Sequence, residues 1–100
     1  MNNKIMNIDE IVSLIKPLVE KYKIEKVYLF GSYAREEADE ESDLDFLVYG
    51  GIDFKPVSIF AFAEEIRNIT NKNVDAFEIR EINTDSEFYN EILRERRLIA

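Results

Sequence analysis

The hydrophobic residues of this chain follow two different periods, which separate expected helices from expected strands. Near the N-terminus they recur every three or four residues, at Ile8, Ile11, Val12, Ile15, Leu18, Val19 and Tyr22. A helix with one apolar face has this spacing, and Asn7 or Asp9 is placed to cap its first turn. Pro17 lies inside the segment, so we expect either a kinked helix or two short helices that meet at the proline.

Two later segments have the same helical period. One begins at Lys55-Pro56, ends at Asn71-Lys72-Asn73, and has an apolar stripe at Ile59, Phe62, Ala63, Ile66 and Ile69. The other follows the capping sequence Thr84-Asp85-Ser86-Glu87, runs to about Arg96, and points inward with Phe88, Ile92 and Leu93. We interpret the stripes as core packing, because such stripes rarely serve any other purpose.

Short apolar runs between these segments predict strands. The first is Val27 to Phe30, the second is the run to Tyr49 that Asp43-Leu44-Asp45 opens, and the third is Val74 to Ile79. A Gly50-Gly51 turn follows the second strand, and Leu98-Ile99 adds either a short final strand or an apolar patch.

A Gly31-Ser32 pair comes directly after the first expected strand. Glycine lets the backbone turn sharply, and the free amide groups of such a turn can bind a phosphate. We expect residues 32 to about 37 to form a short helix whose N-terminal amides point at that phosphate. Arg35 is the nearest fixed positive charge, and it either steadies the phosphate or pairs with a nearby acid that anchors the loop.

Two carboxylates open the second strand. Asp43 and Asp45 are two positions apart, so they share one face of the strand with Cα atoms about 6.6 Å apart, while Leu44 points into the core. Magnesium is commonly held by one or two carboxylates together with substrate phosphates. A phosphate at Gly31-Ser32 beside a metal on these two acids is half of a site for phosphoryl or nucleotidyl transfer.

A third carboxylate lies in the third expected strand. The alternation there puts Asp75 on the same face as Phe77 and Ile79, where an apolar residue is expected. Asp75 could complete a metal site and accept the proton of an attacking hydroxyl. The alternative is a partly exposed position on an edge strand, where an acid has no special role.

The composition narrows the chemistry further. The sequence contains no Cys and no His, which excludes thiol chemistry, imidazole catalysis and ordinary zinc sites. The net charge is -8, and residues 36–45 hold seven of the 21 acids but no base. Such a segment repels nucleic acid and favours a metal-dependent nucleotide site or a basic partner. With no apolar run of membrane-spanning or signal-peptide length, we expect a cytoplasmic protein.

The two motifs together carry a family resemblance. Leu29-Phe30-Gly31-Ser32-Tyr33-Ala34-Arg35, followed by Ser42-Asp43-Leu44-Asp45-Phe46-Leu47-Val48, resembles the signature of the minimal nucleotidyltransferases (MNT) of the DNA polymerase β superfamily. One difference is Glu36, because the family usually has Gly after the Arg. The resemblance implies an α/β fold of the α+β type: the polymerase β-like core, with a mixed sheet of three or four strands and helices covering one face. Residues 1–100 are then a single minimal nucleotidyltransferase domain.

The resemblance also implies an activity. Gly31, Ser32 and Arg35 would bind the triphosphate of ATP, and the catalytic acids that hold two Mg²⁺ ions would be Asp43, Asp45 and Asp75. Proteins of this family typically act as antitoxins that transfer AMP to a tyrosine of a HEPN-domain ribonuclease toxin. We therefore expect a HEPN-domain toxin as partner, by resemblance alone.

Two other classes of function remain open. One is a binding module that neutralises its partner sterically, without catalysis, for which Glu36 is a mild argument. The other is a nucleotidyltransferase that modifies a small molecule such as an antibiotic. That class normally has a second domain for its substrate, and a domain of this length has no room for one.

Overall fold

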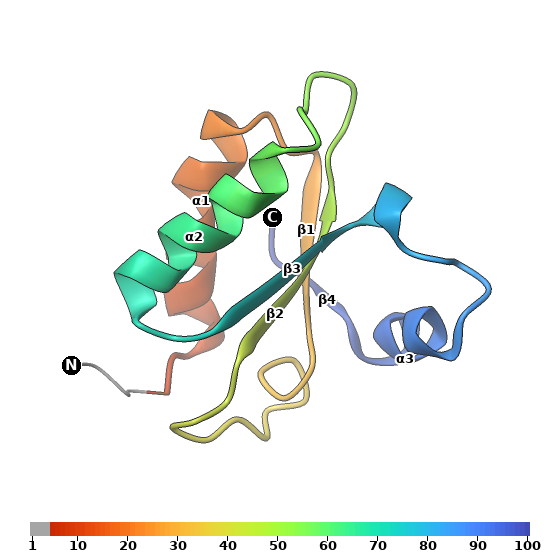
Figure 1. The fold of residues 1–100 in the computed structure, drawn as a ribbon. Coiled ribbons are helices and arrows are strands. Elements are labelled where there is room, and N and C mark those ends of the chain that lie inside the picture. The colour runs from red at the N-terminus through yellow and green to blue at the C-terminus, as the bar shows by residue number, and fades with distance from the viewer. Residues whose placement is uncertain (1–4) are drawn as a thin grey trace.

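The structure, a computed structural model, describes residues 5–100. This part of the chain forms three α-helices, α1 (Ile8–Lys21), α2 (Ser58–Thr70) and α3 (Glu87–Glu95) (Figure 1). Its strands are β1 (Lys26–Phe30), β2 (Leu44–Tyr49), β3 (Val74–Glu78) and β4 (Arg97–Leu98), and a 3₁₀ turn, η1 (Ile79–Glu81), follows β3.

The strands form one mixed sheet in the order β3-β2-β1-β4. β1 is antiparallel to both β2 and β4, whereas β2 and β3 are parallel and are connected through α2. Parallel strands need such a crossover connection, and a helix usually supplies it. The predicted α+β class, the mixed sheet and the short final strand are confirmed, although β4 begins one residue earlier than expected, at Arg97.

The first helix begins where its capping residues predict. The Asn7 side chain accepts a hydrogen bond from the Glu10 amide (2.8 Å), and the Glu10 carboxylate accepts one from the Asn7 amide (3.0 Å). This reciprocal capping box satisfies two amides that the helix leaves unpaired. Pro17 lies inside one helix, so the alternative of two short helices is wrong.

The core lies between the sheet and the helices α1 and α2. Leu44, Phe46 and Val48 point from β2 toward these two helices, as the alternation predicted, and Ile11, Ile15, Phe62 and Ile66 meet them from α1 and α2. At the outer edge of this helix pair, the Glu65 carboxylate of α2 accepts hydrogen bonds from Lys21 (2.8 Å) and from the Tyr22 hydroxyl.

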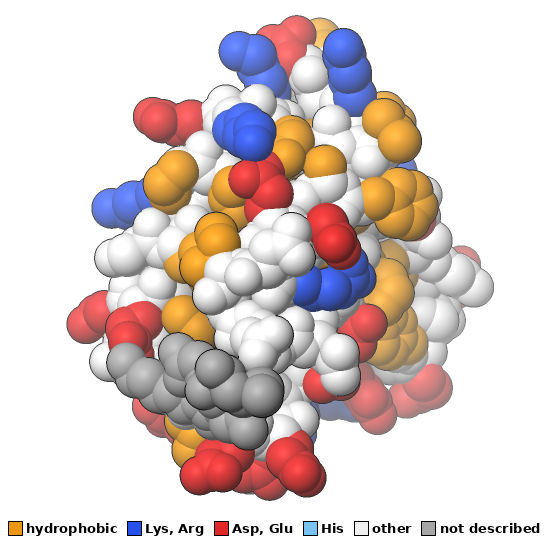
Figure 2. Space-filling model, turned by 60° about the vertical axis from the view of Figure 1, so that its left-hand side comes forward, with side chains coloured by type: hydrophobic (Ala, Val, Ile, Leu, Met, Phe, Trp, Pro, Cys, Tyr) orange, Lys and Arg blue, Asp and Glu red, His pale blue; other side chains and the backbone are white. Residues whose placement is uncertain are grey.

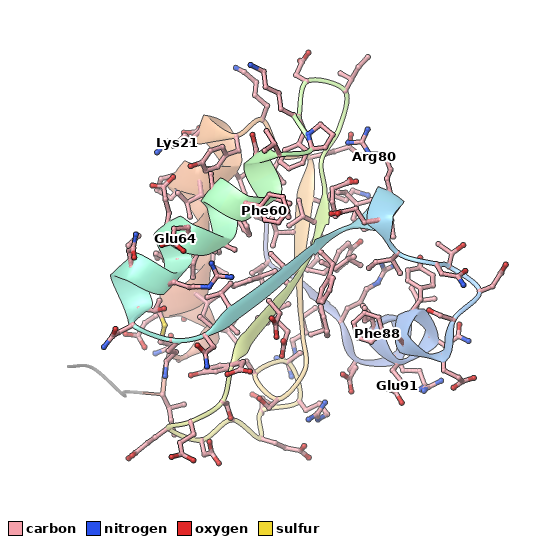
Figure 3. All side chains as sticks on the ribbon, viewed as in Figure 1. Lys21, Phe60, Glu64, Arg80, Phe88 and Glu91 are labelled. Carbon is pink, nitrogen blue, oxygen red and sulfur yellow. The ribbon has the colours of Figure 1, made fainter. Side chains whose placement is uncertain are left out.

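The third helix occupies the opposite face of the sheet, which corrects the expectation that helices cover one face only (Figure 1). Ile92 of α3 is buried against Phe30 and Leu47, which point away from α1 and α2. Phe88 packs edge-on to Phe30 and Phe77, although its side chain stays half exposed, as does that of Leu93 (Figure 3). The alternating apolar residues of β1 and β2 therefore have partners on both faces.

The ends of two predicted elements differ from expectation. α2 begins at Ser58, because residues 55–57 form a turn in which the Ser58 amide donates to the Lys55 carbonyl (2.8 Å). β3 ends at Glu78, whose buried carboxylate accepts hydrogen bonds from the Gly50 amide (3.1 Å) and from the amide and side chain of Arg80. By accepting the Arg80 amide, the Glu78 carboxylate caps the start of η1, and the strand ends at the same residue.

The surface of the α1–α2 side carries scattered hydrophobic side chains among charged ones (Figure 2). On α2 the large exposed ones are Phe60 and Ile69. Acidic side chains gather at the end of the molecule where the loop between β1 and β2 lies (Figures 1 and 2). Within residues 5–100, no helix has the length and apolar character needed to cross a membrane.

Candidate active site

Gly31 ends β1 in a conformation that other residues rarely adopt, with φ at +76°. A Cβ at this position would lie 2.3 Å from Oδ2 of Asp45, closer than a side chain can approach. The missing side chain therefore does two things: it allows the left-handed turn, and it lets the Asp45 carboxylate lie directly against the backbone of the turn. The sequence predicted the turn, and the structure adds the contact with Asp45.

The segment after Gly31 is a series of turns and not the short helix that the sequence predicted. The Arg35 amide donates to the Gly31 carbonyl (3.1 Å), the Glu37 amide to the Ser32 carbonyl (2.9 Å), and Glu36 has a left-handed φ of +60° that ends the helical path. Among the hydrogen bonds within residues 5–100, none is donated by the amides of residues 32–34. Amides left over in this way at the start of a helical turn are the groups that bind anions.

The register of β2 and β3 brings two of the three predicted acids together. Asp45 pairs with Asp75 across the parallel strands, on the face that carries α3 and not the one that carries α1 and α2. β3 is an edge strand and Asp75 is exposed, as the alternative interpretation expected, and Asp75 also lies beside a second acid.

The third acid, Asp43, lies just before β2. Its neighbour Leu44 is fixed by a hydrogen bond from its amide to the Asn73 carbonyl (3.0 Å). Asp43 also lines a polar cavity of about 370 Å³ with Ser42, Lys72 and the adjoining loop residues. The acidic loop before it is folded on Asp39, whose carboxylate accepts hydrogen bonds from the Glu41 amide (2.9 Å) and the Ser42 hydroxyl (3.2 Å).

The charges of the three acids act on one another. Burial, the charges of Asp75 and Asp43, and hydrogen bonding with Asp75 together raise the pKa of Asp45 to about 7, and Arg35 opposes the shift. A buried carboxylate beside like charges gains or keeps its proton unless a cation compensates it. The negative charges of the other two acids thus both act on Asp45.

The donor set fits a hard cation, although its geometry in this structure is not that of a formed metal site. Within residues 5–100, no three His, Cys, Asp or Glu side chains are arranged to hold a metal ion. Carboxylate oxygens are nevertheless the ligands that Mg²⁺ prefers. The tight packing of Asp45 against Gly31 and its raised pKa both indicate a carboxylate that a cation would stabilise.

Arg35 pairs with acids, which is one of the two roles expected for it. Its Nε donates to Glu37 (2.9 Å), and its Nη1 donates to both carboxylate oxygens of Glu95 (3.1 and 3.0 Å). Glu95 also accepts a hydrogen bond from the Gly31 amide (3.3 Å). No signal in the sequence pointed to Glu95, because it lies 60 residues from Arg35 and resembles any acid on an exposed helix face.

A second group that the sequence did not reveal is a pair of buried polar side chains under the turn. The hydroxyl of Tyr33 and the ammonium of Lys72 are buried and have no hydrogen-bond partner among residues 5–100. The Lys72 Nζ lies 5.9 Å from the centre of the Tyr33 ring, which gives it a cation–π contact. The sequence places Lys72 only in the segment that ends the expected helix, and gives no sign of its burial.

Known proteins resemble this chain in sequence. The sequence profile of the family described as Polymerase beta, Nucleotidyltransferase matches residues 13–100. Two relatives from Methanocaldococcus jannaschii carry the name protein adenylyltransferase. One is 37% identical over 70 residues, covering 70% of this chain and 75% of the relative. The other is 35% identical over 81 residues, covering 75% of this chain and 92% of the relative.

Solved structures share the fold. A toxin–antitoxin structure with AMP-PNP matches with a TM-score of 0.73 and 20% identity, over 95% of this chain and 73% of that one. A structure described as a minimal nucleotidyltransferase matches with a TM-score of 0.73 and 24% identity, over 92% of this chain and 95% of that one. A tri-AMPylated Shewanella oneidensis HEPN toxin in complex with an MNT antitoxin matches with a TM-score of 0.69 and 18% identity, over 93% and 71%.

The nucleotidyltransferase class of enzyme that the motifs predicted is therefore confirmed. Because the family profile covers residues 13–100 and the two relatives are aligned over most of their own length, this chain belongs to the polymerase beta nucleotidyltransferase family.

Proposed function

We propose that this protein transfers AMP from ATP to a tyrosine hydroxyl of a HEPN-type ribonuclease toxin, and that it acts as the antitoxin of that toxin. In this proposal residues 1–100 are a single minimal nucleotidyltransferase domain. The observation that supports it most directly is the pairing of Asp45 with Asp75 beside the Gly31 turn. A carboxylate pair next to a row of unpaired amides suits the transfer of a nucleotide from a triphosphate.

The turn after β1 binds the triphosphate in this proposal. Gly31 and Ser32 bring the backbone close to the phosphates, and the amides of residues 32–34, which donate no hydrogen bond within the described chain, supply donors. Arg35 adds a guanidinium, whose fork of N–H groups matches phosphate oxygens. Fixed donors of this kind stabilise the charge that develops on the phosphates.

In this proposal Asp43, Asp45 and Asp75 are the residues that would hold two Mg²⁺ ions. When bound, the metal supplies charge neutralisation for the triphosphate and polarises the acceptor hydroxyl. The acids themselves provide oxygen ligands and a negative field that draws cations to this end of the molecule.

The reaction itself is a displacement at the α-phosphorus. The acceptor oxygen forms a bond to that phosphorus, the bond from the phosphorus to the bridging oxygen breaks, and pyrophosphate leaves with the electron pair. The hydroxyl proton passes to a carboxylate oxygen of Asp75, the exposed member of the pair and hence the one that an acceptor can reach.

The relatives and the solved structures support the choice of nucleotide and partner. The Methanocaldococcus jannaschii relatives are named protein adenylyltransferases, and one structural neighbour is a complex with AMP-PNP. Another neighbour is an MNT antitoxin bound to an AMPylated HEPN toxin. These facts concern other proteins, and they make AMP and a HEPN toxin the first pair to test here.

One observation favours the non-catalytic alternative. Glu36 replaces the Gly that the family usually has, and its carboxylate adds negative charge near the triphosphate position. A protein that only binds and blocks its partner would not depend on Asp43 or Asp45. Substitution of these acids therefore separates the two functions.

The test uses purified protein, ATP labelled at the α-phosphate, Mg²⁺ and the HEPN-domain protein of the same genome. We expect label on the partner with the wild type, and a loss of at least about a hundredfold with Asp43→Asn or Asp45→Asn, a typical cost for removing a catalytic group. Asp53→Asn is the matched control, because it makes the same chemical change at an exposed turn beyond β2. Unlabelled partner that both variants still silence would support the steric alternative.

A further inference from the structure

The Glu95 carboxylate occupies the position at which the proposed function would place a phosphate of the nucleotide. It is the last residue of α3, and both of its oxygens accept hydrogen bonds from Nη1 of Arg35, at 3.1 and 3.0 Å. One of them also accepts the Gly31 amide at 3.3 Å. The Glu95 side chain is about one quarter exposed (26%). A carboxylate from α3 thus lies at the end of β1, on the first amide of the candidate site.

The donors that Glu95 uses are the ones that a phosphate would use. A guanidinium and a backbone amide at a strand-to-turn junction form a usual seat for an oxyanion. Two of the three nitrogens of the Arg35 guanidinium are engaged, because Glu37 accepts from its Nε at 2.9 Å and Glu95 accepts from its Nη1. A phosphate that approached this turn would be repelled by the Glu95 carboxylate, which already binds the Arg35 guanidinium.

We propose that Glu95 is an intramolecular competitor of the nucleotide: it occupies part of the triphosphate seat in the free protein and must leave before the phosphates bind to Arg35 and Gly31. This inference rests on the proposed function. The affinity for the nucleotide then depends on the difference between two free energies of binding to Arg35 and Gly31, that of a phosphate and that of the Glu95 carboxylate.

The local structure allows Glu95 to leave without unfolding the domain. Arg96, the next residue, already has extended backbone angles (φ −67°, ψ 146°), so the helix ends at Glu95. β4 is only two residues long and pairs with β1 through Leu98 and Arg97. In this inference Glu95 leaves by a change of side-chain rotamer at the end of the helix, a smaller and faster motion than local unfolding.

A different role for Glu95 would have the opposite effect. If Glu95 only orients Arg35 toward the phosphate, then its loss leaves Arg35 mobile and weakens nucleotide binding. If Glu95 competes, then its loss strengthens binding. The sign of the change in affinity therefore decides between the two roles.

The experiment compares Glu95→Gln with Glu91→Gln in the full chain. Glu91 lies on the same helix, one turn earlier and exposed (Figure 3), so its substitution removes the same charge without touching the seat. Dissociation constants are measured with Mg²⁺ for a non-hydrolysable ATP analogue and for inorganic tripolyphosphate, which lacks the base. We expect Glu95→Gln to bind both ligands about tenfold more tightly than Glu91→Gln, as for the loss of one competing ion pair.

A double variant tests the route of the effect. Because Glu95 acts by covering Arg35, the gain from Glu95→Gln should shrink to within about twofold when Arg35→Gln is also present. Thermal unfolding without nucleotide shows that each variant is folded, and Glu95→Ala provides a second substitution at the same position.

The outcomes separate the inference from the function on which it rests. Binding by Glu95→Gln that equals or is weaker than binding by Glu91→Gln overturns the competitor role, and leaves the proposed nucleotidyltransferase intact. No binding of either ligand to the wild type or to any variant overturns the proposed function and the inference together.

Discussion

Gly31 shapes the backbone of the candidate site and also makes room for one of its acids. Its positive φ turns the chain out of β1, and its missing side chain makes room for the carboxylate of Asp45. Gly51 has the same kind of backbone, with φ at +75°, but a Cβ there would lie 3.3 Å from the nearest atom of Glu25. A side chain at either glycine would strain the backbone, but only a side chain at Gly31 would also collide with a residue of the candidate site.

We predict that Gly31→Ala destabilises the fold by about 3 kcal/mol, whereas Gly51→Ala costs about 1 kcal/mol, the usual price of a side chain in a left-handed conformation. The excess at Gly31 comes from the displaced Asp45 carboxylate. Urea unfolding of both variants measures the difference. Equal losses would show that Asp45 does not pack against the turn.

Glu36 is the position at which this chain departs from the family pattern, and it has a left-handed φ of +60°. Glu36→Gly should raise the free energy of unfolding by about 1 kcal/mol, because glycine adopts this conformation without strain. The lost ion pair with Arg97 (3.3 Å) is largely exposed and contributes little. Glu36→Ala loses the same ion pair but keeps the strain, so a similar gain in that variant would contradict the argument.

Asp45 is expected to reduce stability in metal-free solution. Its folded pKa of about 7 lies above the ordinary carboxyl value, so the folded state resists ionisation. Stability is therefore lost as the pH rises from about 4 through 7, the window in which the unfolded chain has released this proton and the folded chain has not. With a discount for solvent screening, Asp45→Asn should gain roughly 1 to 2 kcal/mol at pH 8 and almost nothing at pH 4.5.

Urea unfolding in EDTA at the two pH values tests this, with Asp53→Asn as the control for net charge. A gain that is the same at pH 4.5 and pH 8 would mean that the Asp45 carboxylate is not the cause. The expected combination is a more stable but inactive protein, which is common where acids converge for catalysis.

At the scale of elements, α3 connects the sheet with the candidate site. Arg96, which follows the helix, lies over the Tyr28 ring (4.2 Å to its centre), and its Nη1 donates to the Tyr49 hydroxyl (3.0 Å). Tyr28 and Tyr49 also pack edge-on to each other, on the face of the sheet that carries α3. These contacts fix the end of the helix that carries Glu95.

We predict that Arg96→Ala destabilises the protein by about 1 to 2 kcal/mol, through the lost cation–π contact with Tyr28 and the lost hydrogen bond to the Tyr49 hydroxyl. Arg94→Ala, an exposed position in the last turn of α3, should cost less than about 0.5 kcal/mol. Thermal unfolding compares the two. Equal effects would indicate that Arg96 does not hold α3 on the sheet.

Local signals in the sequence were enough to predict most elements. The Asn7 cap and the apolar stripe predicted α1, and alternation predicted which residues of β2 point toward the helices. The short helix after Ser32 was wrong, because the left-handed Glu36 ends it and no sequence pattern reveals a positive φ at a glutamate. The side of the sheet on which α3 packs depends on contacts between distant residues, which periodicity does not encode.

The candidate site was predictable to a similar degree. The motif and the alternation singled out Asp45 and Asp75, but the parallel register that pairs the two residues comes from the structure. Glu95 could not be predicted, since its partners Gly31 and Arg35 are about sixty residues away. The buried ammonium of Lys72 was missed because Asn71-Lys72-Asn73 resembles an ordinary helix end.

At the scale of the whole molecule, charge is distributed unevenly. The net charge is -8, and the loop between β1 and β2 brings its acids to the end of the molecule at which β2 and β3 begin. Such a field attracts metal ions and basic surfaces, and it repels nucleotides until cations compensate it. This charge distribution is consistent with the proposed use of Mg²⁺-bound ATP and with a proposed partner whose contact surface is basic.

The central claim is that the carboxylates of β2 and β3 catalyse AMP transfer. Asp75→Asn tests it most directly, because Asp75 is exposed and its substitution leaves the core untouched. The measurement is the rate at which labelled AMP joins the HEPN-domain partner, with Asp53→Asn alongside. The account predicts a loss of at least about a hundredfold for Asp75→Asn and an unchanged rate for Asp53→Asn. Equal rates for both variants and the wild type would contradict it.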